Sequence, residues 1–291
     1  MNKTSYSFFF QIILLFCSSH VHAELKPLRV GITAVLIEQN ISSNQQLARY
    51  IGNKLDLPVE TVYRKSYREI NEMLGRSEID IAIVCGYAYV VGRKDYGIEL
   101  VASPTINGRP FYRSYVIVPA ASEDKDFFSM RGKRYAFTDP LSNSGYLVPV
   151  FWLTQKGENL DNFFKKYIFT RGHYNSIEAV AMRIVDGASV DGYVWEQAKK
   201  IEPRMASMTK VVMESEEYPF TPVVAREKID KDLKKRILNV LLSMNRDPEG
   251  INILRGIGID GFIKVADDFY NPIREMERKV KAGSETGRHD R

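Results

Sequence analysis

Short apolar runs alternate with segments of helical periodicity over the first part of the chain. Apolar, β-branched runs typical of buried strands occupy residues 28–32, 59–63 and 79–84. Apolar residues recur at three- and four-residue intervals over 44–55, which predicts a helix, and a Ser-x-x-Glu capping box predicts another over 67–74. This alternating order predicts a mostly parallel sheet covered by helices.

A second strand–helix series follows, and two extended segments connect it to the first. Its predicted elements are strands over 134–138, 167–170 and 192–194 and helices over 145–155 and 176–186. The predicted connecting segments are the extended runs 112–118 and 221–225. We therefore expect an α/β fold in which two mixed-sheet lobes are joined by two crossing strands.

The expected lobe boundaries follow from the two crossings. Lobe 1 is expected to comprise residues 24–115 and 222–291, and lobe 2 to comprise 116–221 with the hinge strands at its ends. The last segment, 281–291, is rich in glycine and charged residues, so we expect it to be disordered.

Residues 1–23 have the layout of a cleavable secretory signal peptide. Lys3 provides a weakly positive start, an apolar core covers 8–16, and Val21 and Ala23 are the short residues expected before a cut after Ala23. The apolar core is shorter than the roughly 20 residues that span a bilayer. An uncleaved anchor and a lipoprotein attached through Cys17 remain alternatives. The pattern predicts a protein secreted into the periplasm.

Composition narrows the possible chemistry. The formal net charge is only +5 and is scattered along the chain, which argues against nucleic-acid binding and is compatible with an anionic ligand. Without the signal peptide, Cys85 is the remaining cysteine, so no internal disulfide can form. His173 is the one histidine between the signal peptide and the polar tail. We therefore expect no metal site, no cofactor and no catalytic residues.

The most informative stretch lies between a predicted strand and a predicted helix. Ser142, Asn143 and Ser144 precede Gly145, and Pro149 places the start of the helix close by. The first turn of a helix has unpaired N–H groups and the positive end of the helix dipole, so it can bind an anion. The alternative is ordinary helix capping, for which Ser and Asn are common. His173 lies in a second polar loop that also follows a strand, and it could donate to the same anion.

These stretches carry a family resemblance that extends over nearly all of the chain after residue 23. The matching stretches, in order, are 113–118, 132–140, 142–149, 172–173, 190–191, 247–250 and 258–262. With these residues the chain resembles the periplasmic substrate-binding proteins of phosphonate, phosphite and phosphate ABC transporters.

The resemblance implies a type II periplasmic-binding-protein fold with a hinged cleft. It implies that Ser142, Asn143 and Ser144 hold phosphoryl oxygens, although Asn143 stands where the family usually has Thr. Gly145, which has no side chain, is expected to let the ligand approach the backbone. The family's histidine corresponds to His173. A family tyrosine corresponds to Tyr89, for which a packing role is the alternative, and Asp191 is included among the expected ligand-binding residues.

Other residues depart from the family pattern. Some members hold a substrate amino group with acidic residues, and none of the acidic residues here matches cleanly: Asp191, Glu196, Glu216 and Glu217. Trp195, Tyr218 and Phe220 make the region more aromatic than expected. They either shape the pocket for a different small anion or pack at the hinge.

Two functions from different classes fit these observations. The first is a monomeric binding protein that captures a small oxyanion and delivers it to an ABC transporter permease. The second is a sensory module that reports the ligand to a membrane receptor such as a histidine kinase. An enzyme is disfavoured because the sequence has no plausible catalytic set and no Gly-x-Ser-x-Gly motif.

Overall fold

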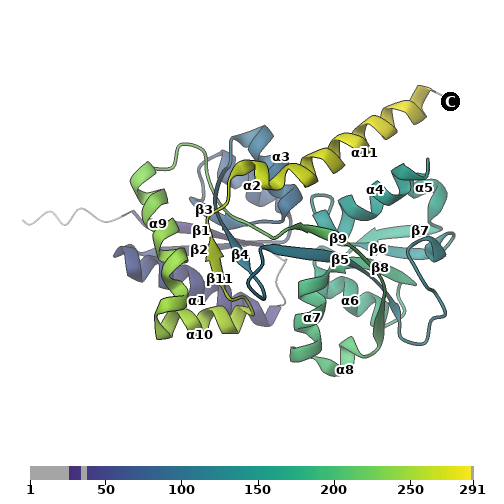
Figure 1. Cartoon of the computed structure of the whole chain (residues 1–291), viewed down its shortest axis with the longest axis horizontal. Coiled ribbons are helices and arrows are strands. Elements are labelled where there is room, and N and C mark those ends of the chain that lie inside the picture. Colours follow the sequence, from purple (N-terminus) through teal and green to yellow (C-terminus); the bar gives the residue numbers. More distant parts are fainter. Residues whose placement is uncertain (1–25, 34–37, 290–291) are drawn as a thin grey trace, which may run out of the picture.

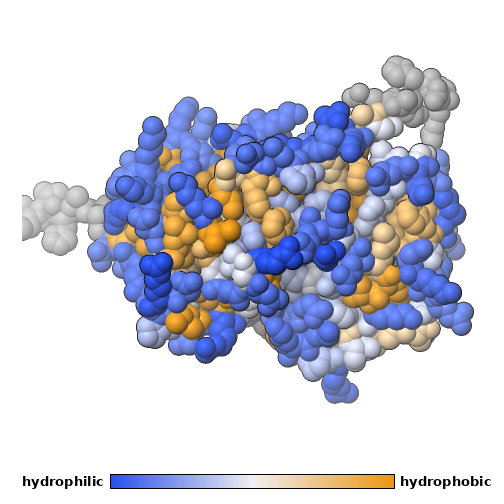
Figure 2. Space-filling view, in the orientation of Figure 1, coloured by the Kyte–Doolittle hydropathy of each residue, from blue (hydrophilic) through white to orange (hydrophobic). Residues whose placement is uncertain are grey.

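The computed structural model describes residues 26–33 and 38–289, and the predicted signal peptide lies outside them. The chain forms two α/β lobes that lie side by side, each built around its own sheet (Figure 1). Both sheets mix parallel and antiparallel pairs, as the sequence predicted. The face shown in Figure 2 is mostly hydrophilic, with apolar residues gathered in patches on both lobes.

Lobe 1 contains a six-stranded sheet in the order β11-β4-β10-β3-β1-β2. Its strands are β1 (Leu28–Thr33), β2 (Val59–Arg64), β3 (Ile81–Ile83), β4 (Glu99–Thr105), β10 (Val223–Ala225) and β11 (Gly261–Ile263). Its helices are α1 (Glu38–Leu55), α2 (Tyr67–Gly75), α3 (Gly86–Tyr96), α9 (Lys231–Ser243), α10 (Pro248–Ile257) and α11 (Asn271–His289). Short 3₁₀ turns cover Met244–Arg246 and Asp267–Tyr270.

Lobe 2 contains a five-stranded sheet in the order β7-β6-β8-β5-β9. Its strands are β5 (Phe111–Pro119), β6 (Arg134–Phe137), β7 (Lys166–Phe169), β8 (Gly187–Asp191) and β9 (Thr209–Pro219). Its helices are α4 (Val148–Gln155), α5 (Leu160–Phe163), α6 (His173–Ala181), α7 (Gly192–Ile201) and α8 (Pro203–Ala206). A 3₁₀ turn covers Phe128–Met130, and a π-helical turn over Asn143–Leu147 leads into α4.

The chain passes between the lobes twice, at residues 106–110 and 220–222. Strands β5 and β9 pair with each other from Phe111↔Pro219 to Pro119↔Thr209, so both lie in the sheet of lobe 2. The first crossing therefore comes a few residues before the boundary expected at 115. The two short crossings place the carboxyl ends of β1, β2 and β3 in lobe 1 close to the ends of β6, β7 and β8 in lobe 2.

Three local expectations were wrong. Residues 192–194 form no strand, because the Asp191 side chain caps a helix that begins at Gly192. Helix α6 begins at His173 rather than at Ser176, so His173 lies in its first turn and not in a loop. Helix α11 continues to His289, where we expected disorder from residue 281, and it packs along α4 of the other lobe (Figure 1).

Candidate ligand-binding site

The turn that follows β6 is buried, and Gly145 allows it to pack closely against the end of the strand. Ser142, Asn143 and Ser144 have no exposed surface, and Ser142 Oγ accepts a hydrogen bond of 3.0 Å from the Gly145 N–H. A Cβ atom on Gly145 would collide with Thr138 Oγ1 and crowd Ser142 Oγ, so only glycine fits there. The turn therefore combines a helix start with three buried polar side chains, which is the arrangement that binds anions.

His173 is held in one tautomer by the backbone. The Asp191 N–H donates to His173 Nδ1 at 2.9 Å, and Thr138 Oγ1 lies 3.1 Å from the same nitrogen. Nδ1 must therefore be the unprotonated nitrogen, which leaves the proton of the neutral ring on Nε2. Burial lowers the pKa of His173 to about 3, so the ring is neutral near pH 7. His173 thus presents a fixed Nε2–H donor.

Several buried polar atoms near this turn have no hydrogen-bond partner among the described residues. They are Ser144 Oγ, His173 Nε2, Asn143 Oδ1, the Tyr67 hydroxyl and Asp139 Oδ2, of which the last forms an ion pair with Arg171 Nη1 at 3.6 Å. A buried polar atom without a partner costs about 1–3 kcal/mol, so native structures rarely leave several of them together. Three of these atoms are hydrogen-bond donors, as an oxyanion would require.

Asp191 has a structural task beside the same site. Its Oδ1 accepts from the Tyr193 N–H at 2.9 Å and so caps α7, while its own N–H is bound by His173. Burial raises the pKa of this carboxyl to about 7. The structure therefore brings Asp191 to the cluster as expected, but its carboxyl faces the start of α7.

Two tyrosines and the cysteine, none of them expected as ligand residues, complete the walls. The Tyr112 hydroxyl accepts from Asn143 Nδ2 at 3.1 Å, and Cys85 Sγ accepts from the Asn143 N–H at 3.0 Å across the two lobes. Burial raises the pKa of Tyr67, of Tyr112 and of the Cys85 thiol, so all three stay protonated. The signal that could have found Tyr67 is its position at the start of α2, in the short connection after β2 of the parallel sheet. Tyr112 carried no comparable signal.

Tyr89 is not brought to this cluster. It is buried in α3, its hydroxyl donates to Asp267, and its ring packs edge-on against Tyr270 at 5.0 Å. Tyr89 therefore makes packing contacts inside lobe 1, which was the alternative reading of its role.

The aromatic residues near the crossings have separate roles. Trp195 Nε1 donates to Thr209 Oγ1 at 3.0 Å, which ties α7 to β9. The Tyr218 hydroxyl donates to Glu216, and Phe220 contacts the Tyr112 ring at 5.4 Å. Phe220 is thus the one of the three that lies against a wall of the site.

The described residues contain neither a metal-binding cluster nor a helix that could span a membrane. No group of three or more His, Cys, Asp or Glu side chains in this part of the chain could hold a metal ion. Within the same residues, no helix combines the length and the apolar character needed to cross a bilayer.

Comparisons with known proteins give a consistent result. The family described as the periplasmic substrate-binding protein of the phosphonate ABC transporter matches residues 31–270. The phosphonates-binding periplasmic protein of Escherichia coli is 26% identical over 274 residues, which cover 92% of this chain and 80% of that protein.

Solved structures agree with the two-lobed fold. A binding protein of a phosphonate ABC transporter from Pseudomonas aeruginosa superposes with a TM-score of 0.83 at 22% identity, covering 89% of this chain and 88% of that one. PhnD1 from Prochlorococcus marinus, solved in complex with methylphosphonate, superposes with a TM-score of 0.79 at 21% identity, covering 88% of this chain and 98% of that one.

Proposed function

The chain belongs to the periplasmic substrate-binding proteins of phosphonate ABC transporters, and we propose that it captures a small phosphorus oxyanion between its lobes for delivery to a membrane permease. The family consists of transport components and not of enzymes. The observation that carries the proposal is the set of buried donors without partners, Ser144 Oγ, His173 Nε2 and the Tyr67 hydroxyl, beside a helix start. Relatives named for phosphonate binding, and one solved with methylphosphonate, support the same ligand class.

The proposed ligand supplies the hydrogen-bond acceptors that these buried donors lack within the protein. Its phosphoryl oxygens accept from Ser144 Oγ and His173 Nε2 in lobe 2 and from the Tyr67 hydroxyl in lobe 1. These three donors are neutral at pH 7, so they stabilise the anion through oriented dipoles in a site that excludes water. The Asn143 side chain, which replaces the threonine usual in the family, is fixed by Tyr112 and completes the wall of the turn.

The remaining parts of the proposal concern location and motion. We place the protein in the periplasm as a monomer without nucleic-acid partners. Residues 1–23 direct its export as a signal peptide and are then cleaved off. Residues 106–110 and 220–222 act as the hinge between two lobes with approximately the boundaries predicted from sequence. Ligand exchange then requires opening at these two crossings, as in other hinged binding proteins.

Calorimetry of the mature chain with methylphosphonate and with phosphate tests the ligand. Ser144→Ala removes a hydrogen bond to a charged group, which is worth about 1.5–3 kcal/mol, so affinity should fall about ten- to hundredfold. Ser207→Ala is the matched control, because Ser207 is exposed and its hydroxyl bonds only the local Arg204 carbonyl. Wild-type affinity in Ser144→Ala, or absence of binding to any phosphorus oxyanion, would contradict the proposal.

A further inference from the structure

A small pocket lies at the seam between the lobes, and we call it the seam pocket. Lobe 1 contributes Thr33, Lys65 and Tyr67 to its lining, and lobe 2 contributes Thr138, Asp139, Arg171 and Gly172. Its volume is about 10 Å³, which is room for about one water molecule. Tyr67 is one of the proposed donors, and Thr138 Oγ1 lies 3.1 Å from His173 Nδ1. The seam pocket therefore borders the proposed ligand site.

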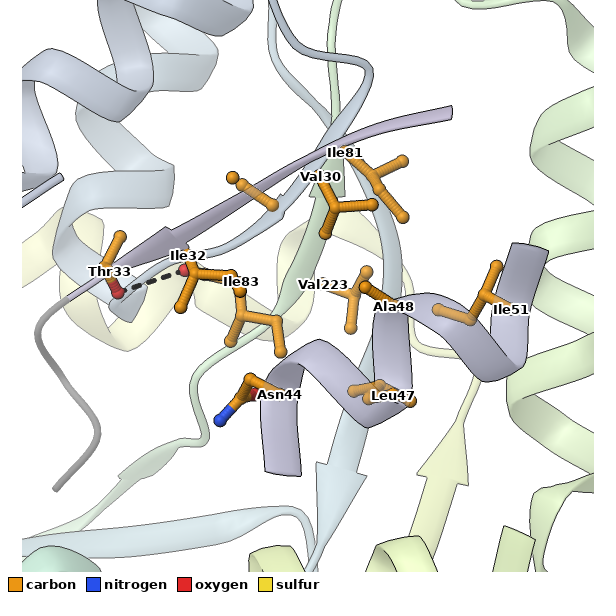
Figure 3. A pocket seen from close by; sticks show the side chains of 12 residues that line it. Val30, Ile32, Thr33, Asn44, Leu47, Ala48, Ile51, Ile81, Ile83 and Val223 are labelled. Carbon is orange, nitrogen blue, oxygen red and sulfur yellow. Dashed lines mark hydrogen bonds between the residues drawn. The ribbon is translucent and has the colours of Figure 1, made fainter. Parts of the chain in front are cut away.

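The two threonines of the seam pocket already have hydrogen-bond partners. Thr33 also borders the apolar cavity of lobe 1 drawn in Figure 3, where its hydroxyl donates to the Ile83 carbonyl at 3.3 Å. The Thr138 hydroxyl faces the ring of His173, as described above. What the seam pocket adds to the ligand site is therefore charge, which comes from its one acidic and two basic residues.

Asp139 is the acidic residue, and its carboxyl is buried. Asp139 Oδ1 accepts from the Leu141 N–H at 2.8 Å, and Oδ2 lies 3.6 Å from Arg171 Nη1. Burial raises the pKa of this carboxyl, while the Leu141 N–H and Arg171 oppose the increase. Asp139 therefore balances at most one of the two positive charges that line the seam pocket.

Lys65 and Arg171 reach the seam pocket from opposite lobes. Lys65 lies in the connection between β2 and α2, it is exposed, and its ammonium forms no ion pair within residues 26–33 and 38–289. Arg171 lies between β7 and α6, two residues before His173, and its side chain is about half-exposed. Its φ of 63° lies in the left-handed region that favours glycine, and its N–H donates to the Thr138 carbonyl at 2.8 Å. The fold thus holds a cation at this point although a glycine would have less strain.

The proposed donors lack the charge that would attract an anion from a distance. All three are neutral at pH 7 and act through short-range dipoles, whereas the attraction between full charges extends much further. The buried carboxyls beside them, Asp139 and Asp191, repel an anion whenever they are ionised. Lys65 and Arg171 are the residues of the seam pocket that can offset this repulsion.

We infer that Lys65 and Arg171 form a cationic rim on the two sides of the seam, which attracts the phosphonate anion and supplies the charge that the neutral donors lack. This inference rests on the proposed function and adds two residues that determine affinity for an anion. Charges at the rim of a binding site act mainly on the association rate and on the salt dependence of binding. The contribution of the rim should therefore disappear at high ionic strength, whereas that of the buried donors should remain.

Calorimetry of the mature protein with methylphosphonate at two ionic strengths tests the rim. At ionic strengths of about 0.01 M and about 1 M, the Debye length is about 30 Å and about 3 Å. Lys65→Gln and Arg171→Gln should each weaken binding about three- to tenfold at the lower ionic strength and less than about twofold at the higher one.

Two groups of control variants separate the charge at the seam from other effects. Lys94→Gln and Lys166→Gln remove the same charge at exposed positions far from the seam, at the last turn of α3 and the first residue of β7, and should bind like wild type. Lys65→Arg and Arg171→Lys keep the charge and should retain both the affinity and the salt dependence of wild type.

The outcomes distinguish this inference from the proposed function. If Lys65→Gln and Arg171→Gln bind like their controls, or weaken binding equally at both ionic strengths, the rim is overturned while phosphonate capture stands. Failure of every phosphorus oxyanion to bind overturns both. A loss in Lys65→Gln that is confined to low ionic strength and absent in Lys65→Arg supports the rim even where the Arg171 variants do not fold.

Discussion

His173 and Asp191 should give the protein two opposite pH dependences that nearly cancel. Burial depresses the pKa of His173 from 6.5 to about 3, so the stability linked to this ring is lost as pH falls below about 6.5. Burial raises the pKa of Asp191 from 3.8 to about 7, so the stability linked to this carboxyl is present below about pH 4 and lost as pH rises towards 7. Between about pH 4 and 6.5 the two effects have opposite signs.

Removing one of the two titrating groups should reveal the pH dependence of stability that the other group causes. Each slope is about 1.4 kcal/mol per pH unit, so over two units a variant should diverge from wild type by about 3 kcal/mol. Relative to wild type, His173→Gln should lose stability as pH rises, and Asp191→Asn should gain it. The slope of the unfolding free energy against pH is more informative than the free energy at one pH. Hydrogen bonds lost in the variants shift the free energy by the same amount at every pH and leave the slope unchanged.

Urea unfolding of the ligand-free mature protein near pH 4, 5 and 6, followed by tryptophan fluorescence, measures these slopes. Groups that titrate elsewhere in the chain contribute equally to all three proteins and drop out of the comparison. If both variants show the wild-type slope, His173 and Asp191 do not have the opposite pKa shifts that their burial predicts, and the assignment of a neutral His173 ring loses its support.

Two further predictions concern the lobe seam and the fold. N-ethylmaleimide should modify Cys85 slowly in the free protein and more slowly with methylphosphonate bound, because Cys85 Sγ contacts the Asn143 N–H where the lobes meet; equal rates by mass spectrometry would show that the ligand does not hold this seam shut. Asp80→Asn should cost about 3 kcal/mol in urea unfolding, because the buried carboxyl binds two arginines, at 3.0 Å and 2.9 Å. Glu78→Gln, which breaks the exposed ion pair with Arg76, should cost much less stability than Asp80→Asn, and equal losses would refute the burial argument.

Hydrophobic periodicity predicted most of the fold because most strands of both lobes contain buried residues, although the edge strands β2 and β7 are at most partly buried. Strands β1, β2 and β5 begin and end within one residue of the ranges predicted for them. The errors came from local signals that competed with this pattern. The run after Asp191 is aromatic and β-branched and so resembles a strand, yet Asp191 is a favoured helix N-cap and the structure follows the cap.

The candidate site was predictable only in part. Ser142, Asn143 and Ser144 could be located because a polar loop after a strand and before a helix has a known physical use. The tautomer of His173 could not, because it depends on a backbone N–H eighteen residues away in sequence. Tyr112 was missed for a related reason: it comes from β5 of the lobe 2 sheet and meets the turn through tertiary contacts alone.

The same geometry connects ligand binding with lobe contact. The turn that holds Ser144 continues directly into α4, and α4 packs against α11 of the other lobe. Phe151 of α4 lies under the Lys279 ammonium, and α11 approaches so closely at Gly283 that a side chain there would collide with Thr154. Helix α4 thus begins beside the proposed ligand site and packs against α11 of lobe 1, so a shift of α4 would be felt at both places. If a ligand binds at the proposed site and stabilises the turn, it should also stabilise the lobe contact, and by thermodynamic reciprocity a stronger α4–α11 contact should tighten ligand binding.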